Sequence, residues 1–380
     1  MGERWDVIIV GLGPAGAAAA HALAAAGARV LALDGRPRHP KPCGGCVSAR
    51  SGRLLEAAGL VPAAWLRAHP VDVTVLEAVG RPGLRHATAS PGAWFVERGR
   101  LDELLRERAA AAGAEVVRAR ARTVSPEGGG WRVSARFDSW RGDWLIGADG
   151  AAGPVGRSLG LGRTRFAYLA LVEERPMPQA LAAELTGVSL LELGAVPGGY
   201  GWLFGRGESL NLGLAGRVGR VGGARALERL YAGFLARHGL GAPGRWRGAF
   251  IPCPDGGPIR VAAGRAAVIG DAAGAADPFL GEGIGQAAQT GLMAARAILA
   301  GDLGRYQADL AATLWREHAS ARRLAKLVYR APRFFQGLAR RRPGAVELAW
   351  RVLRGELGYD RLWGAVWRRL LGLDGVPAKP

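Results

Sequence analysis

The stretch DVIIVGLGPAG, residues 6–16, decides the fold of this 380-residue chain. Its apolar and β-branched start predicts a short buried strand, and the Ala-rich residues 17–26 predict a helix that stops at Gly27. RVLALD, residues 29–34, predicts the next strand. A strand, a helix and a second strand in this order form a βαβ unit, so the sequence predicts a parallel sheet with right-handed crossovers.

The glycines of this stretch have the spacing G-x-G-x-x-G. Gly11 permits the tight turn, Gly13 lets the backbone approach a pyrophosphate, and Gly16 lets the helix pack against the strand. The pattern is weak alone, but here it follows a strand and opens a helix. In that context it predicts a dinucleotide site.

The start of the helix and the end of the second strand complete the predicted dinucleotide site. Pro14 and Ala15 lie where free N–H groups and the positive end of the helix dipole favour phosphates. Asp34 ends the second strand, where its carboxylate can accept hydrogen bonds from ribose hydroxyls.

Two more glycine-rich turns follow predicted strands, at residues 147–150 and 270–285. Asp149 and Asp271 are placed to bind ribose or ribityl hydroxyls, and a solvated turn is the alternative for each. The N–H groups of the second turn's helix start suit the pyrimidine ring of a flavin, whose reduced anion the positive helix end stabilises. The cofactor-binding residues predicted in the second turn are Gly270, Asp271, Pro278, Gly281, Gly283 and Ile284.

The order of these motifs resembles that of para-hydroxybenzoate hydroxylase-type FAD proteins. VERGRLDELL, residues 96–105, is similar to that group's helix led by an Arg and an Asp. The resemblance implies that FAD is the cofactor and that Arg98 faces it. Asp102 is expected to stabilise the helix.

Three further segments resemble the geranylgeranyl reductase family: KPCGGCVS at 41–48, GGYGWLFGRGESLNLGLAG at 198–216 and GELGYDRL at 355–362. The likeness spans nearly the whole chain. Gly205 departs from it, because the family usually has a proline after the aromatic segment. That difference predicts a looser loop at this position.

The family resemblance implies an enzyme that reduces isoprenoid carbon–carbon double bonds with hydride from FAD. An isolated alkene accepts hydride poorly, so such a site needs an apolar tunnel, accurate placement and a proton donor. Tyr200, Trp202 and Phe204 alternate along a predicted strand and therefore share one face. They are candidate substrate-binding residues, and ordinary core packing is the alternative.

Cys43 is the candidate proton donor near the flavin, because a thiol can do acid–base work. The alternative is a small buried hydrophobic residue. Gly44 and Gly45 would let the backbone approach the flavin ring. The resembling family leaves the position of Cys46 free, so the C-x-x-C spacing is interpreted as accidental, with a disulfide to Cys43 as the other interpretation. With Cys253 the chain has three cysteines, and we predict neither a disulfide framework nor a metal site.

Other functions stay open on the same scaffold. The main alternative is an FAD-dependent monooxygenase of an aromatic or lipid substrate, and a halogenase is less favoured. An FAD-containing maturation partner without turnover is the alternative from another class. A separate nicotinamide domain is not visible in the sequence, so the expected reductant is NAD(P)H or ferredoxin.

The net charge of +19, from 51 Lys and Arg against 32 Asp and Glu, rests almost entirely on arginine. A nucleic-acid-binding module is not recognisable, so nucleic acid is not a predicted partner. Residues 315–371 mix Arg with aromatic residues and Leu, which suits either contact with an anionic membrane or ordinary packed helices. The N-terminus enters a strand directly rather than a signal peptide, so we predict a cytoplasmic protein.

The predicted fold is α/β, with an α+β two-domain plan in which a Rossmann-like domain interleaves with a mainly antiparallel sheet. The FAD-binding domain is expected at 1–70, 97–165 and 262–310. The β-rich substrate domain is expected at 71–96 and 166–261, and a helical region at 311–380. Within the first domain, residues 115–124 are expected to form one strand.

Overall fold

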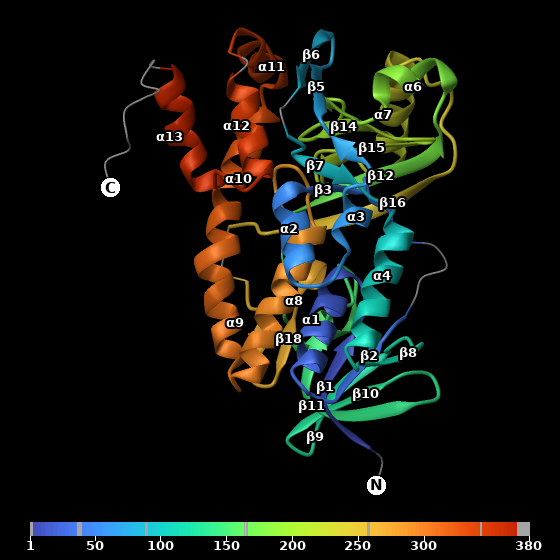
Figure 1. Ribbon diagram of the computed structural model, residues 1–380, viewed down its shortest axis with the longest axis vertical. Helices are drawn as coiled ribbons and strands as arrows, with labels where there is room; N and C mark the ends of the chain where they lie inside the picture. The colour runs from blue at the N-terminus through green and yellow to red at the C-terminus, as the bar shows by residue number, and fades with distance from the viewer. Residues whose placement is uncertain are drawn as a thin grey trace.

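The computed structural model describes residues 3–35, 40–87, 90–162, 164, 166–256, 259–342 and 344–370. Figure 1 shows a lower part built on one sheet, an upper part built on a second sheet, and a column of C-terminal helices along one side. The Rossmann-type α/β fold predicted from the βαβ unit is therefore confirmed.

The lower sheet has the strand order β17-β18-β11-β1-β2-β8, and β9 and β10 extend it as an antiparallel hairpin on β11. Its central pairs, β1 with β2 and β1 with β11, are parallel. The strands are β1 Arg4–Val10, β2 Val30–Leu33, β8 Glu115–Val117, β9 Thr123–Glu127, β10 Gly130–Ser134, β11 Ser139–Gly147, β17 Ala262–Ala263 and β18 Ala266–Val268. The expected single strand at 115–124 is wrong: β2 offers a short parallel partner to β8, and the chain then turns to pair with β10.

Helix α1 (Pro14–Ala25) begins with a proline at its N-terminus, and Gly27 follows it with a φ of +87°. It packs between α4 (Arg98–Ala111) and α8 (Ile284–Leu299). Small residues make the close approach to α8 possible, because a Cβ at Gly291 would lie 2.2 Å from the carbonyl oxygen of Ala15. This packing fixes both glycine-rich helix starts at one edge of the sheet.

The upper sheet has the strand order β16-β12-β15-β14-β13-β5-β6 and is antiparallel apart from the β13–β5 pair. Its strands are β5 Val73–Ala78, β6 Arg81–Ala87, β12 Phe166–Pro176, β13 Val188–Leu193, β14 Tyr200–Arg206, β15 Ser209–Arg217 and β16 Trp246–Cys253. Helices α6 (Gln179–Leu185) and α7 (Ala224–Arg237) also belong to this part.

Side chains alternate across the upper sheet as the sequence predicts. Trp202 and Phe204 pack in a cluster with the C-terminal helices, whereas Leu203 packs with α7 on the opposite face. Gly205 lies inside β14, where it pairs with Leu210, so the expected loose loop is wrong. A Cβ at Gly205 would lie 2.1 Å from the carbonyl oxygen of Leu185, and this close backbone contact explains the glycine.

A small antiparallel sheet of β3 (Cys46–Ser48), β7 (Ala93–Phe95) and β4 (Pro70–Val71) joins the two parts. Trp94 of β7 packs in the lower core, and its neighbour Phe95 packs in the upper one. Helices α2 (Ala49–Ala57) and α3 (Ala63–Leu66) lie between β3 and β4 in the chain, and α5 (Pro154–Leu159) follows β11. The three strands therefore hold the segment that begins at Cys43 between both cores.

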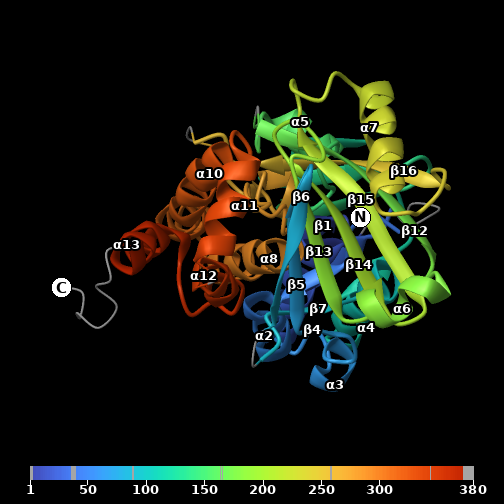
Figure 2. The same cartoon turned by 90° about the horizontal axis from the view of Figure 1, so that it is seen from above.

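The C-terminal region is helical, as predicted. It consists of α9 Leu303–Leu310, the π-helical turn η2 Ala311–Trp315, α10 Arg316–Val328, α11 Pro332–Arg341, α12 Gly344–Leu353 and α13 Tyr359–Leu370. The helices are interrupted before Pro332, the first residue of α11, whereas Pro343 and residues 371–380 lie outside the described residues. Figure 2 shows α10 to α13 beside the upper sheet. Within the described residues, no helix combines the length and apolar character needed to cross a bilayer.

Candidate functional site

A cleft of about 1450 Å³ lies between the two large sheets. Ligand pockets of single small molecules usually measure roughly 300–1000 Å³, so this cleft has room for a large cofactor and a second molecule. Most residues predicted to bind the cofactor line it, namely Gly11, Gly13, Pro14, Ala15, Asp34, Cys43, Gly44, Gly45, Arg98, Asp149, Asp271, Gly281, Gly283 and Ile284. The predicted substrate-binding residues Tyr200, Trp202 and Phe204 line the same cleft.

Three predicted cofactor residues do not line the cleft but support its walls. A Cβ at Gly16 would lie 1.9 Å from the carbonyl oxygen of Gly11, so Gly16 serves helix–strand packing. Gly270 has a φ of +60° and lies against Ala15. Pro278 is buried, and its carbonyl accepts a hydrogen bond of 2.6 Å from the Tyr168 hydroxyl.

The N-terminus of α1 opens on the cleft. Gly13 is its N-cap residue, and the cap has no side-chain hydrogen bond, so the first N–H groups of the helix remain available. A Cβ at Gly13 would meet no atom within 4 Å, and this free space is what a closely approaching diphosphate needs. The observed turn therefore fits the pyrophosphate of a dinucleotide.

Asp34 lies at the end of β2 with 6% of its surface exposed. The Arg106 guanidinium of α4 lies 3.6 Å from its carboxylate, and both side chains line the cleft. Sequence reasoning missed Arg106. The signal was available, because Arg98, Asp102 and Arg106 recur every four residues and so share one face of α4.

Asp149 has a structural task that the sequence did not reveal. Its Oδ2 accepts a 2.8 Å hydrogen bond from the N–H of Val155 and so caps α5. Its buried Oδ1 has no partner within the described residues, and burial raises the pKa of the carboxyl. Gly153 is required beside it, since a Cβ there would lie 1.9 Å from the Asp149 carboxyl carbon. The unsatisfied oxygen fits a hydroxyl donor from a cofactor.

The Cys43 loop is held from several sides. The Asn211 amide of β15 donates to the Cys43 carbonyl at 3.0 Å, and Trp202 Nε1 donates to Asn211 Oδ1 at 2.9 Å. Gly45 has a φ of +70°, and a Cβ there would lie 2.2 Å from the Val96 carbonyl oxygen. The glycine at 45 is therefore required by packing against Val96, the residue that follows β7, a reason the sequence did not show.

Arg98 and Cys43 meet on the wall of the cleft. The guanidinium donates to Asp102 at 2.9 and 3.1 Å, and the Cys43 side chain lies near enough to influence the pKa of Arg98. Burial lowers the pKa of Arg98, but the charge of Asp102 and the sulfur of Cys43 outweigh it and raise that pKa above its usual value. A fixed positive charge therefore sits beside the Cys43 sulfur.

Comparison with known proteins identifies the family to which this chain belongs. A model of the FAD binding domain matches residues 4–184. The chain is 30% identical over 370 residues to the chloroplastic geranylgeranyl diphosphate reductase of Oryza sativa subsp. japonica, covering 87% of this chain and 76% of that protein. It is 33% identical over 410 residues to the menaquinone reductase of Mycobacterium tuberculosis, covering 96% and 94%. The chain belongs to the geranylgeranyl reductase family.

This geranylgeranyl reductase family member is an FAD-dependent oxidoreductase, and FAD is its cofactor. The solved structure of a geranylgeranyl bacteriochlorophyll reductase-like protein from Thermoplasma acidophilum shares its fold. That protein is 24% identical and superimposes with a TM-score of 0.74, covering 85% of this chain and 87% of the other.

The aromatic wall of the family member is continuous. The ring centroids of Tyr200 and Trp202 lie 6.1 Å apart, as do those of Trp202 and Phe204, and Phe204 stacks on Phe95 at 5.2 Å. The Tyr200 hydroxyl donates to the Leu280 carbonyl, and burial raises the pKa of that phenol. These side chains both pack in the upper core and line the cleft, so the two interpretations of the segment are compatible.

Of the other two cysteines, Cys46 also lines the cleft, whereas Cys253 is buried away from it. All three thiols are free. Burial, with the nearby Glu282 carboxylate, raises the pKa of Cys46 above its usual value, and burial with Asp277 does the same for Cys253. Both are therefore neutral, poorly reactive thiols at neutral pH.

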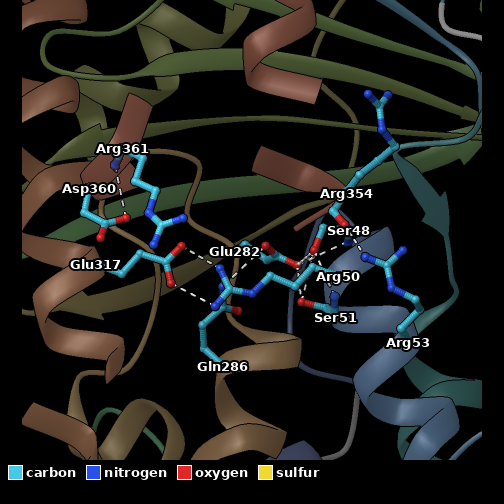
Figure 3. Close-up of polar contacts among 10 residues, drawn as sticks. All are labelled: Ser48, Arg50, Ser51, Arg53, Glu282, Gln286, Glu317, Arg354, Asp360 and Arg361. Carbon is cyan, nitrogen blue, oxygen red and sulfur yellow. Dashed lines mark hydrogen bonds and ion pairs between the residues drawn. The ribbon is translucent and has the colours of Figure 1, made fainter. Parts of the chain in front are cut away.

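Sequence reasoning also missed a polar cluster at the start of α8 (Figure 3). Glu282 Oε1 accepts hydrogen bonds of 2.6 Å from the hydroxyls of Ser48 and of Ser51. Beside it, Arg50 binds both oxygens of Glu317, at 2.5 and 2.8 Å. The cluster ties β3 and α2 to the glycine-rich start of α8, and Lys41 adds an ion pair to Asp271. It therefore fixes the Cys43 loop against the helix start on the other side of the cleft.

Behind this cluster lies a smaller cavity of about 220 Å³. Asp277 lines it, and burial raises the pKa of this carboxyl to about 7. His318 lines it too, and burial lowers the pKa of this imidazole to about 3. Near pH 7 the His318 imidazole is therefore neutral and the Asp277 carboxyl is about half protonated, beside the charged side chains of Arg50 and Glu317 on the same wall.

Proposed function

We propose that this protein reduces carbon–carbon double bonds of an isoprenoid lipid. The observation that carries the proposal is the shared cleft, in which the aromatic wall of Tyr200, Trp202 and Phe204 faces the same space as the cofactor-binding turns. An aromatic, water-excluding wall suits an isoprenoid chain, whose recognition rests on apolar contact. Two relatives are named as reductases of geranylgeranyl diphosphate and of menaquinone, which both carry isoprenoid chains.

Bound FAD supplies the hydride that an alkene accepts. The residues of this chain hold the alkene in place, exclude water from it and supply the proton. Trp202 is fixed by its hydrogen bond to Asn211, so its ring presents a rigid face to the substrate. Rigid placement matters because an unactivated alkene reacts only when it is held close to the donor.

Cys43 is the proposed proton donor to the second carbon of the double bond. Its loop is held by Asn211 and by the small sheet, and its sulfur lies on the wall of the cleft. The Gly45 N–H donates to the sulfur at 3.3 Å, and the positive charge of Arg98 lies beside it. A positioned acid of this kind typically accelerates a reaction by about 100- to 10,000-fold.

The reductant is proposed to be NAD(P)H or ferredoxin. Product analysis without oxygen tests the function. The FAD-loaded protein is incubated with dithionite-reduced ferredoxin or with NADPH, and with geranylgeranyl diphosphate or menaquinone. We expect a product heavier by two hydrogen atoms for each reduced double bond. A product that needs oxygen and gains an oxygen atom would indicate a monooxygenase, and no product with either lipid would favour the maturation partner.

A further inference from the structure

The junction of α10 and α11 carries an unusual surface. Residues 318–346 hold seven arginines and one lysine and no acidic residue. We define the α10–α11 face by five of its exposed residues, Lys326, Leu327, Arg330, Phe334 and Arg341; Arg323, Arg333, Arg340 and Arg342 are exposed as well. Figures 1 and 2 show α11 beside β5 and β6, with α10 next to it in the column of C-terminal helices.

Most aromatic residues of the C-terminal helices are packed. Trp350 is 2% exposed and Tyr359 is 7% exposed, so much of this region is ordinary core. The α10–α11 face differs, because Phe334 is 66% exposed and Leu327 is 46% exposed. Exposed apolar groups flanked by cations fit the interface of a bilayer better than they fit water alone.

The exposure of Phe334 does not come from a loosely held helix. On the inner side of α11, Gln336 is buried and donates to the Pro82 carbonyl at 2.7 Å. Arg333 donates to the Val79 carbonyl at 3.0 Å and holds the start of the helix on the β5–β6 turn. Phe334 and Arg341 lie seven residues apart and so share the outer side of α11. The helix is anchored, and its outer side is left to an external partner.

The charges of this face point to an anionic partner. Within the described ranges, none of Lys326, Arg330 and Arg341 forms an ion pair with a carboxylate of the chain. Cations of this kind are each worth about 1 kcal/mol next to an anionic bilayer. A nucleic acid would use the charges but would leave Leu327 without a role. An anionic phospholipid surface uses both the cations and the apolar side chains.

The face also lies close to the cleft. Tyr329 follows α10 directly, and its ring stacks on Tyr200 at 6.1 Å and on Phe279 at 5.7 Å. Tyr200 lines the cleft. One buried ring therefore connects the aromatic wall of the cleft with the helix junction that carries the α10–α11 face.

We propose that the α10–α11 face docks on an anionic phospholipid bilayer. Phe334 and Leu327 enter the headgroup boundary, and Lys326, Arg330 and Arg341 bind lipid phosphates. Docking in this place would put the cleft beside the membrane that holds its lipid substrate, a consequence that rests on the proposed function.

Vesicle flotation of the FAD-loaded full chain tests the docking without any isoprenoid. The vesicles are phosphatidylcholine alone, or an equal mixture of phosphatidylcholine and phosphatidylglycerol. We expect flotation with the mixed vesicles, and a decrease at high salt. Phe334→Glu should lower the partition coefficient by at least about tenfold. The pair Arg330→Gln and Arg341→Gln should lower it by about 25-fold.

Phe137→Glu is the matched control. Phe137 is 84% exposed and lies under the Arg136 guanidinium at 4.9 Å, between β10 and β11 at the opposite end of the molecule. It should float like the wild type. Leu327→Gln is a second variant of the face in case Phe334→Glu folds poorly, and FAD absorbance and melting check each protein.

Several results would overturn the proposal. Equal flotation of the wild type with neutral and with mixed vesicles would contradict it, as would no flotation with either kind. An equal loss of vesicle binding in Phe137→Glu and Phe334→Glu would also contradict it, because the loss would then come from the added negative charge alone. Because no substrate is present, failure here leaves the proposed reduction standing, and failure of the reduction leaves the docking result standing.

Discussion

The side-chain amide of Asn211 donates a 3.0 Å hydrogen bond to the backbone carbonyl of Cys43. The same amide accepts from Trp202 Nε1 at 2.9 Å, and Asn211 is only 4% exposed. One buried residue of the upper sheet therefore sets both the Cys43 loop and an aromatic ring of the cleft.

Replacing this amide should destabilise the protein. In Asn211→Leu, the indole N–H of Trp202 and the Cys43 carbonyl both lose their partner, which should lower the free energy of unfolding by about 2–3 kcal/mol. Urea unfolding of the FAD-loaded protein measures this. In a double-mutant cycle, Trp202→Phe with Asn211→Leu should cost less than the two single changes summed. Strict additivity of the two free-energy changes would show that the hydrogen bond between Trp202 and Asn211 does not contribute to stability.

Gly45→Ala should be far more damaging than a glycine substitution of similar φ elsewhere. The matched control is Gly27→Ala, since Gly27 has a φ of +87° but a Cβ there meets no atom within 4 Å. The control should cost about 1 kcal/mol from φ strain alone. At Gly45 the Cβ would also lie 2.2 Å from the Val96 carbonyl oxygen, so we expect about 3 kcal/mol or more. Equal melting temperatures of the two variants would refute the steric explanation.

Substitution of the two cysteines of the C-x-x-C stretch should change turnover to different extents. Cys43→Ser keeps a hydrogen-bonding atom beside Arg98 but donates a proton less readily, so anaerobic turnover should fall by about 100-fold. Cys46→Ser should leave turnover unchanged, because its thiol is buried in β3 beside Glu282. FAD content is measured in both variants. A Cys43→Ser protein with wild-type turnover would remove Cys43 from the mechanism.

The buried Asp277 carboxyl should make stability depend on pH. Burial raises its pKa from 3.8 to about 7, so the folded state holds the proton more tightly than the unfolded state. Its stabilising contribution is therefore complete below about pH 4 and is lost as the pH rises to about 7, by up to about 4 kcal/mol.

Asp277→Asn tests this dependence. An amide oxygen can still accept from the N–H groups of Phe279 and Leu280. The stability of the variant relative to the wild type should therefore rise between pH 4 and 7 and stay constant above pH 7. A stability difference that is flat from pH 4 to 8 would mean that Asp277 titrates as an exposed carboxyl does.

The sequence could predict the parts of the site that depend on local pattern. The βαβ unit follows from residues 6–34, because a buried strand, a glycine turn and an Ala-rich helix each have a strong local signature. The shared face of Tyr200, Trp202 and Phe204 follows from the two-residue period of a strand. Arg106 was also within reach, through the four-residue spacing on α4.

The remaining features depend on contacts between distant segments. The Asn211–Cys43 bond joins residues 168 positions apart, and the Ser48–Glu282 bond joins residues 234 positions apart. The prediction of a loose loop at Gly205 was wrong because the nearby carbonyl oxygen of Leu185 leaves no room for a side chain there. No local sequence pattern reveals that contact. Likewise, the strand at 115–124 was split by the short length of its partner β2, which lies far away in the chain.

Rapid mixing without oxygen shows whether this FAD-dependent oxidoreductase passes hydride to an isoprenoid double bond. The FAD-loaded protein is reduced by dithionite and mixed anaerobically with geranylgeranyl diphosphate or menaquinone while the visible absorbance of oxidised flavin is followed. The proposal predicts that this absorbance returns with at least one of the two lipids, together with a product whose isoprenoid chain has lost a carbon–carbon double bond, as distinct from a quinone reduced only on its ring. If the absorbance returns only after oxygen is admitted, with either lipid present, the proposal is contradicted.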